Sequence, residues 1–90
     1  MNELLQGVTV GNIAKGSPYF GKIEGIVVIN VQRGSIAWRS GLRTADIITS
    51  VNKLQVKNIK EFLSVVDKKE DSLLLRINRG NSAAFLVLKK

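Results

Sequence analysis

The feature that most constrains the fold is a succession of short apolar runs, each bounded by turn residues. They read VTVG (8–11), GIVVINV (25–31), ADIITSVN (45–52), SLLLRIN (72–78) and AFLVLK (84–89). Runs of about four to eight residues that are rich in β-branched side chains are typical of β-strands. One longer segment, at 58–69, has a helical pattern instead. The chain therefore predicts a mainly β (α+β) domain.

The two central runs predict strands inside a sheet. Gly25–Val31 is apolar at nearly every position, so we expect a strand that is buried on both faces. Ala45–Asn52 places Ile47 on one face and Ile48 on the other. Between the first two strands, the segment Gly11–Glu24 contains the single proline of the chain among several glycines, which predicts a loop.

The short helix and the final hairpin have local signals of their own. Ser35 can cap a short helix, and Gly41 ends it because glycine readily adopts the left-handed conformation. The last two strands are joined by Arg79–Ser82, a favourable hairpin turn. Simple alternation places three residues on one face of the first of these strands: Leu73, Leu75 and Ile77.

The segment 58–69 gives the clearest helix prediction. Asn58 is the N-cap, and Glu61 can return a hydrogen bond to the N–H of Asn58. Lys68 and Lys69 stand at the other end, where the helix dipole favours cations. Four apolar residues recur at helical spacing and form one stripe: Ile59, Phe62, Leu63 and Val66.

Composition restricts the chemistry. Ninety residues, of which 44% are hydrophobic, are enough for one domain with one modest core. Without histidine or cysteine, the chain contains no Ser-His-Asp or Cys-His centre and no imidazole or thiolate ligand for a metal. The seven carboxylates are scattered or stand among lysines, so none pairs as a general acid and base. We therefore expect no catalytic residue, no metal and no cofactor.

The net charge of +7 raises nucleic acid as a partner. The basic residues, however, are spread from Lys15 to Lys90, and the five aromatic residues do not alternate with them. This pattern favours a solvated basic surface over a nucleic-acid site. No apolar run approaches the ~20 residues of a membrane-spanning helix. We expect neither nucleic-acid binding nor membrane insertion.

The stretch 25–56, GIVVINVQRGSIAWRSGLRTADIITSVNKLQV, contains an ordered series of small, apolar and acidic residues: Gly34, Ser35, Ala37, Gly41, Leu42, Asp46, Ile47, Ile48, Val51 and Asn52. This series resembles the central part of a PDZ domain. It is most similar to the PDZ domains that follow the protease domain in HtrA/Deg serine proteases. The resemblance covers most of residues 5–90. It implies one PDZ domain over 1–90, a five- to six-stranded, partly open barrel capped by two helices.

The chain departs from the family pattern at a few positions. Arg33 and Ile36 stand where prolines are usual, and Ala45 and Lys53 stand where glycines are usual. All four lie at turns or helix starts, so we expect local backbone changes without loss of the fold. Trp38 replaces a small residue; its ring either folds onto the loop beneath it or contacts a partner.

The resemblance implies a peptide-binding site. PDZ domains bind the free C-terminus of a peptide in a loop x-Φ-Gly-Φ, where Φ is apolar, and here that loop is Leu5-Gln6-Gly7-Val8. Glycine allows backbone N–H groups to converge on the carboxylate without a Cβ that obstructs it. The peptide would add to the strand after the loop. The groove would be lined by Val10, Ile59, Leu63 and Val66, with Phe62 turned into the core. From the residues alone, ordinary core packing and a glycine kink remain an alternative.

Two functions remain open under this resemblance. The domain binds C-terminal or unfolded peptide segments, or it is an assembly element with a weak or blocked groove. Gln6 stands where the family usually has an apolar residue, and this slightly favours the assembly function.

The resemblance also implies a parent protein. The isolated domain would not be an enzyme, and a trypsin-like serine endopeptidase domain would stand elsewhere in the parent chain. Partners would be peptides and other PDZ or protease domains of a periplasmic oligomer in protein quality control. Because the chain stops at the close of its last strand, we expect the second, C-terminal PDZ domain.

Overall fold

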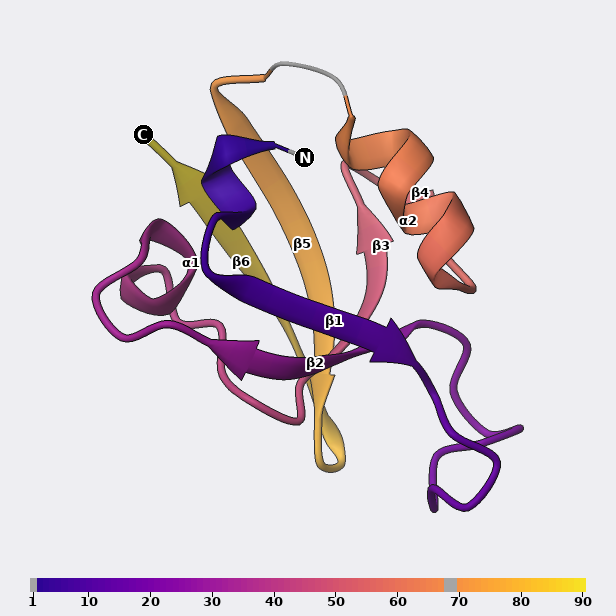
Figure 1. The fold of residues 1–90 in the computed structure, drawn as a ribbon. Helices are drawn as coiled ribbons and strands as arrows, with labels where there is room; N and C mark the ends of the chain where they lie inside the picture. Colours follow the sequence, from indigo (N-terminus) through magenta and orange to yellow (C-terminus); the bar gives the residue numbers. More distant parts are fainter. Residues whose placement is uncertain (1, 68–69) are drawn as a thin grey trace.

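The computed structural model describes residues 2–67 and 70–90. Its order of elements agrees with the mainly β architecture that the sequence predicts (Figure 1). A 3₁₀ turn η1 is followed by six strands and two α-helices: η1 Glu3–Leu5, β1 Val8–Asn12, β2 Ile26–Val31, α1 Ile36–Arg39, β3 Ile47–Val51, β4 Leu54–Gln55, α2 Ile59–Val66, β5 Ser72–Arg79 and β6 Ser82–Lys89.

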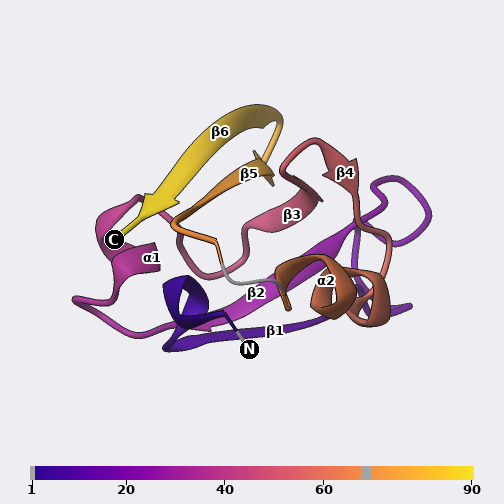
Figure 2. The ribbon, with the colours of Figure 1, turned by 90° about the horizontal axis from the view of Figure 1, so that it is seen from above.

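The strands form one antiparallel sheet in the order β1-β2-β3-β5-β6, and β4 pairs with β3. Strands β1 and β6 are the two ends of this order, so the sheet curls without closing (Figure 2). The helices α1 and α2 lie toward opposite sides of the curled sheet (Figure 1). This is the partly open, two-helix architecture that the resemblance implied.

The inner face of the sheet and the two helices enclose a single apolar core. The β5 residues expected on one face are all buried, and Phe62 of α2 is buried with them. Ile47 and Ile48 of β3 are both buried although they lie on opposite faces. The largest fully buried side chains come from η1, β2, β3, α2, β5, β6 and the loop before β3: Leu4, Leu5, Ile26, Val28, Leu42, Ile47, Ile48, Phe62, Leu73, Leu75, Ile77 and Leu88.

The predicted caps and turns are confirmed. The Ser35 side chain accepts a hydrogen bond from the N–H of Trp38 at the start of α1, and Gly41 follows that helix with φ +107°. In the last hairpin, Arg79 pairs with Ser82, and Gly80 has φ +61° at the first turn position, as a type II′ turn requires.

Strand β2 is not buried on both faces as predicted. Ile29 is 52% exposed, and Asn30 is exposed as well. The reason is a β-bulge: Thr9 pairs with Asn30 but Val10 pairs with Val28, so Ile29 is the extra residue. An unpaired bulge residue re-aims its side chain, which no alternation pattern anticipates.

The start of α2 is predicted correctly, but the hydrogen-bond partner of Glu61 is not. The Asn58 side chain accepts from the N–H of Glu61, as expected for an N-cap. The Glu61 carboxylate, however, accepts from the N–H of Lys57, one residue before the predicted donor. The helix ends at Val66, and the two predicted C-terminal lysines, 68 and 69, lie outside the described residues.

The two positions where glycine is replaced retain a glycine-like backbone. Ala45 has φ +76° and Lys53 has φ +71°. Asn52 precedes Lys53 with φ +50°, so the β3–β4 connection is a two-residue turn with both φ values positive, the type I′ geometry. The backbone change expected at these two positions is therefore not seen, and the side chains tolerate a conformation that suits glycine.

Candidate functional site

The loop before β1 is held by its own backbone. The N–H groups of Leu5 and Gln6 donate to the carbonyl oxygens of Asn2 and Glu3, which closes the η1 turn. The Gly7 carbonyl accepts from the N–H of Gln32 at 2.9 Å. Among the described residues, no partner is seen for the N–H of Gly7. The N–H groups of Leu5 and Gln6 are thus used within the loop, whereas that of Gly7 is not.

Gly7 itself is required by two features of the structure. Its φ of +87° lies in the left-handed region that favours glycine. A Cβ at this position would lie 2.9 Å from the Cβ of Gln32 and 3.5 Å from that of Ser35. The sequence predicts that a Cβ on residue 7 would obstruct a bound carboxylate. The structure adds that it would lie too close to Gln32, in the segment that follows β2.

Strand β1 presents a free edge. The bond between Gly7 and Gln32 makes Val8 and Val31 a non-hydrogen-bonded pair, so the N–H and C=O of Val8 point away from β2. Val28 uses its own N–H and C=O toward Asp46 and Ala45, on the side away from β1. Its partner Val10 is therefore also in a non-hydrogen-bonded pair, with polar groups that point outward. An added strand would find donors and acceptors at both valines.

Helix α2 lies beside this edge and is attached to it. The Asn12 side chain, at the end of β1, accepts from the N–H of Ile59 at 2.8 Å, and α2 packs against β1. This bond aligns the start of the helix with the end of the strand. The residues predicted to line the groove therefore lie on two neighbouring elements, β1 and α2. No sequence signal pointed to Asn12, because its partner is 47 residues away.

The predicted groove residues differ in how much surface they offer. Leu5 and Val66 are fully buried and belong to the core, and Val8 is 7% exposed. Val10 and Ile59 are partly buried and pack against the core. Leu63 is 43% exposed and is the most open apolar side chain of the predicted set. The structure thus brings strand and helix residues together, but one predicted lining residue, Val66, and one predicted loop residue, Leu5, are buried in the core.

A comparison with known families supports one assignment. Residues 27–79 match the family model described as PDZ domain, which is more than half of the chain. The chain belongs to the PDZ domain family.

Relatives of this PDZ domain are bacterial serine endoproteases. The periplasmic serine endoprotease DegP of Escherichia coli K12 is 42% identical over 69 residues, which is 77% of this chain and 15% of that protein. A probable DegP-like periplasmic endoprotease of Buchnera aphidicola (subspecies Baizongia pistaciae) is 38% identical over 85 residues, 94% of this chain and 17% of that protein. The chain thus spans less than a fifth of the length of these relatives.

Two solved structures have the same fold as this chain. The crystal structure of the HtrA3 PDZ domain bound to a phage-derived ligand, FGRWV, superposes with a TM-score of 0.79 at 27% identity, covering 92% of this chain and 80% of that one. The HtrA-type protease AlgW with a decapeptide gives a TM-score of 0.76 at 22% identity, over 92% of this chain and 27% of that one, and supports the fold alone.

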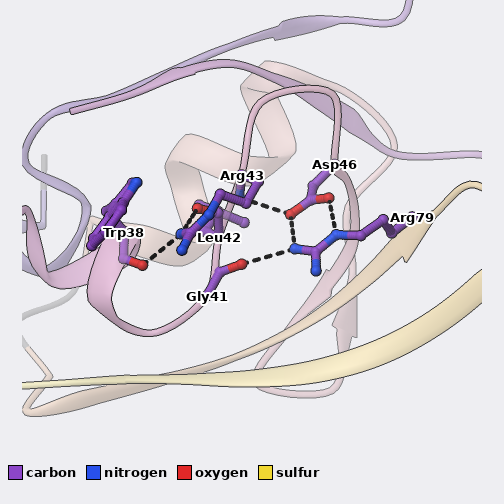
Figure 3. Close-up of polar contacts among 6 residues, drawn as sticks. All are labelled: Trp38, Gly41, Leu42, Arg43, Asp46 and Arg79. Carbon is purple, nitrogen blue, oxygen red and sulfur yellow. Dashed lines mark hydrogen bonds and ion pairs between the residues drawn. The ribbon is translucent and has the colours of Figure 1, made fainter. Parts of the chain in front are cut away.

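An ion pair between buried Asp46 and exposed Arg79 fixes the α1–β3 segment of this PDZ domain (Figure 3). The Asp46 carboxylate is 1% exposed and accepts from Nε and Nη2 of Arg79 at 2.8 and 2.7 Å. It also accepts from the N–H of Arg43 at 2.9 Å, and Arg79 Nη2 donates to the Gly41 carbonyl. The hydrogen bond with Asp46 raises the pKa of Arg79. The role of Arg79 had no sequence signal, because its partner is 33 residues away.

Trp38 lies at the outer side of the same segment. The Arg43 guanidinium stacks 4.4 Å from the centre of its ring, and that of Arg33 lies 5.9 Å away. Arg43 Nη1 also donates to the Trp38 carbonyl at 2.6 Å (Figure 3). The half-buried ring is thus packed against Arg43, while its predicted contact with a partner stays a prediction.

The part of the chain that the structure describes contains neither a cluster of metal-ligand residues nor a membrane-spanning helix. Within residues 2–67 and 70–90, no group of three or more carboxylates is close enough together to hold a metal ion. In the same residues, no helix has the length and apolar character needed to cross a membrane.

Proposed function

We propose that this PDZ domain binds the C-terminal segment of a peptide as an additional strand between β1 and α2. Residues 1–90 act as one domain in this proposal. The observation that carries it is the outward orientation of the Val8 and Val10 backbone at the free edge of the sheet. The HtrA3 PDZ domain, which has the same fold, was solved with a peptide ligand.

The position of the peptide follows from the loop. Its carboxylate would accept hydrogen bonds from the N–H groups of Gly7 and Val8, where two successive N–H groups with a left-handed residue make a small anion-binding concavity. Upstream residues of the peptide would pair with Val10 and then approach Asn12. The last side chain of the peptide would lie against Val8 and Leu63, which makes an apolar C-terminal residue favourable.

The affinity expected from such a site is modest. One buried apolar side chain contributes ~1.5–3 kcal/mol, and each backbone hydrogen bond contributes ~0.5–1.5 kcal/mol. Association costs ~4 kcal/mol or more. The balance allows at best a micromolar dissociation constant, about −8 kcal/mol. This strength suits a module that samples unfolded or cleaved chains.

The relatives indicate where such a module would act. We infer that it serves a Deg/HtrA-type serine endoprotease in the periplasm, where it presents peptide segments to a catalytic domain outside this chain and contributes to regulation and oligomeric assembly. The inference rests on relatives named periplasmic serine endoproteases. No catalytic role is proposed for any residue of this domain.

A second candidate function is assembly through another face. On β6, Phe85 is 64% exposed and Val87 is 56% exposed, and both point to the side opposite the core-facing Leu88. Exposed apolar neighbours of this kind are typical of interaction surfaces. Under this alternative, substitution of Phe85 and Val87 by serine in the parent protein would reduce oligomer size while peptide binding at β1 stays unchanged.

Amide NMR titration with one peptide in two forms tests peptide binding. The six-residue peptide ends in valine and has either a free C-terminal carboxylate or a C-terminal amide. We expect shifts at Gly7, Val8, Val10 and along 59–66 with the free carboxylate only. Leu63→Ser should weaken binding, whereas Leu54→Ser, at another exposed leucine, on β4, should not. No shift with either form at millimolar peptide would disprove the proposal and leave assembly as the function.

A further inference from the structure

A cavity of about 340 Å³ lies outside the part of the groove discussed so far. It is formed by the end of β1, the start of α2 and the loop 13–25. The residues that line it are Asn12, Ile13, Phe20, Gly21, Ile23, Glu24, Gly25, Lys57 and Asn58. Its volume lies at the lower end of the ~300–1,000 Å³ typical of ligand pockets, which is ample for one large side chain.

The cavity is continuous with the proposed peptide groove. Asn12 and Asn58 belong both to the cavity lining and to the junction where the Asn12 side chain holds the N–H of Ile59. This junction is the end of the groove that lies away from Gly7. Figure 1 shows the loop after β1 extending beyond the start of α2. A peptide that leaves the groove upstream therefore passes over this cavity.

The lining has the chemistry of a site for an apolar side chain. Phe20 is 49% exposed, although it is aromatic, and Ile13 and Ile23 are only partly buried. The rim contains an ion pair in which Lys57 Nζ lies 3.7 Å from the Glu24 carboxylate, with both side chains exposed. Apolar walls with a paired, electrically neutral rim favour an uncharged aromatic or aliphatic side chain over a charged one.

The register of an added strand identifies which peptide residue reaches the cavity. In an antiparallel arrangement the C-terminal residue lies beside Val8 and the fifth residue from the end lies beside Asn12. The separation is four strand residues, about 13 Å at ~3.3 Å per residue. Side chains of alternate residues point to the same face, so the fifth residue points to the same side as the C-terminal one.

We propose that this cavity is a second specificity subsite, which binds an aromatic or large aliphatic side chain at the fifth residue from the C-terminus of the peptide. The inference rests on the proposed peptide binding at β1. With this subsite, the domain selects chains that have two apolar residues four positions apart. A ligand of four residues or fewer cannot reach the subsite.

Three free-carboxylate peptides test this. A hexapeptide has phenylalanine at the fifth residue from the end, a second has serine there, and a tetrapeptide has the four C-terminal residues alone. We expect the phenylalanine peptide to bind about five- to tenfold more tightly than the serine peptide, since most of a large apolar side chain becomes buried. It should also shift the amides of Ile13 and of residues 20–24, and the serine peptide should not.

Phe20→Ser should remove most of this preference without changing the dissociation constant of the tetrapeptide. Phe85→Ser is the matched control, because Phe85 is an exposed phenylalanine on β6, away from the groove. Equal affinities of the two hexapeptides for the unmodified domain, or equal effects of both substitutions, would overturn the subsite. Tetrapeptide binding in that case would leave the proposed function intact. A tetrapeptide and hexapeptides that all fail to bind would reject both.

Discussion

Replacement of Asp46 by asparagine tests whether its ion pair with Arg79 holds the α1–β3 segment in place. The substitution preserves the shape of the side chain and removes its charge. Asp46 is 1% exposed, and all three of its hydrogen-bond donors are fixed: two from Arg79 and one from the N–H of Arg43. The NH₂ group of asparagine would have to face one of these donors, so at least one hydrogen bond is lost and its donor is left unsatisfied.

The size of the effect follows from the geometry. Hydrogen bonds to a charged group contribute ~1.5–3 kcal/mol each. The Arg79 side chain is 52% exposed, so water compensates part of the loss on its side, and the lower end of the range applies. We expect the free energy of unfolding to fall by about 1.5–2 kcal/mol. For a domain of this size, that corresponds to a decrease in Tm of roughly 6–16 °C.

Urea unfolding followed by the fluorescence of Trp38, the single tryptophan, measures this change, and circular dichroism checks that the transition has two states. Glu24→Gln is the matched control. It also removes one carboxylate from an ion pair, but Glu24 and Lys57 are both exposed and 3.7 Å apart, so we expect a cost of ~0.5 kcal/mol or less. If Asp46→Asn costs no more than Glu24→Gln, the ion pair does not stabilise the segment and the reasoning is refuted.

Three further substitutions have defined outcomes. Lys53→Gly should raise the free energy of unfolding by about 0.5–1 kcal/mol, because it creates an Asn-Gly type I′ turn. Lys53→Ala should leave the free energy of unfolding nearly unchanged, and equal Tm values for the two variants would contradict this prediction. Gly7→Ala should cost about 2 kcal/mol or more in urea unfolding, owing to its φ and the contact with Gln32, whereas Gly16→Ala, with open space around it, should cost under ~0.5 kcal/mol. Asn12→Ala should cost ~1 kcal/mol and speed amide hydrogen exchange at Ile59; unchanged exchange there would show that the bond does not hold the helix.

The sequence was most informative where the physical cause is local. Ser35 and Asn58 cap helices whose first turns begin at the next residue, and Gly41 and Gly80 adopt the left-handed φ that their positions predict. These features depend on side chains a few residues apart, so a single sequence contains all the information needed. The exposure of Ile29 was missed because a bulge changes alternation without altering the apolar pattern.

What the sequence could not predict depends on long-range contacts. Asp46 with Arg79 and Asn12 with Ile59 pair residues 33 and 47 positions apart, and no periodicity relates them. The same limit applies to the cavity beside Phe20, which exists only because the loop 13–25 returns against the start of α2.

Gly7 shows how the two kinds of information combine. The resemblance identified it as part of a carboxylate loop, but the contact with Gln32 would demand glycine even in a domain that bound nothing. The presence of this glycine is therefore weak support for peptide binding. The outward orientation of the Val8 and Val10 backbone is stronger support, because edge strands that pair with nothing are usually covered, shortened or charged. An edge left open for a peptide ligand explains both features, and the carboxylate-against-amide titration separates this explanation from packing alone.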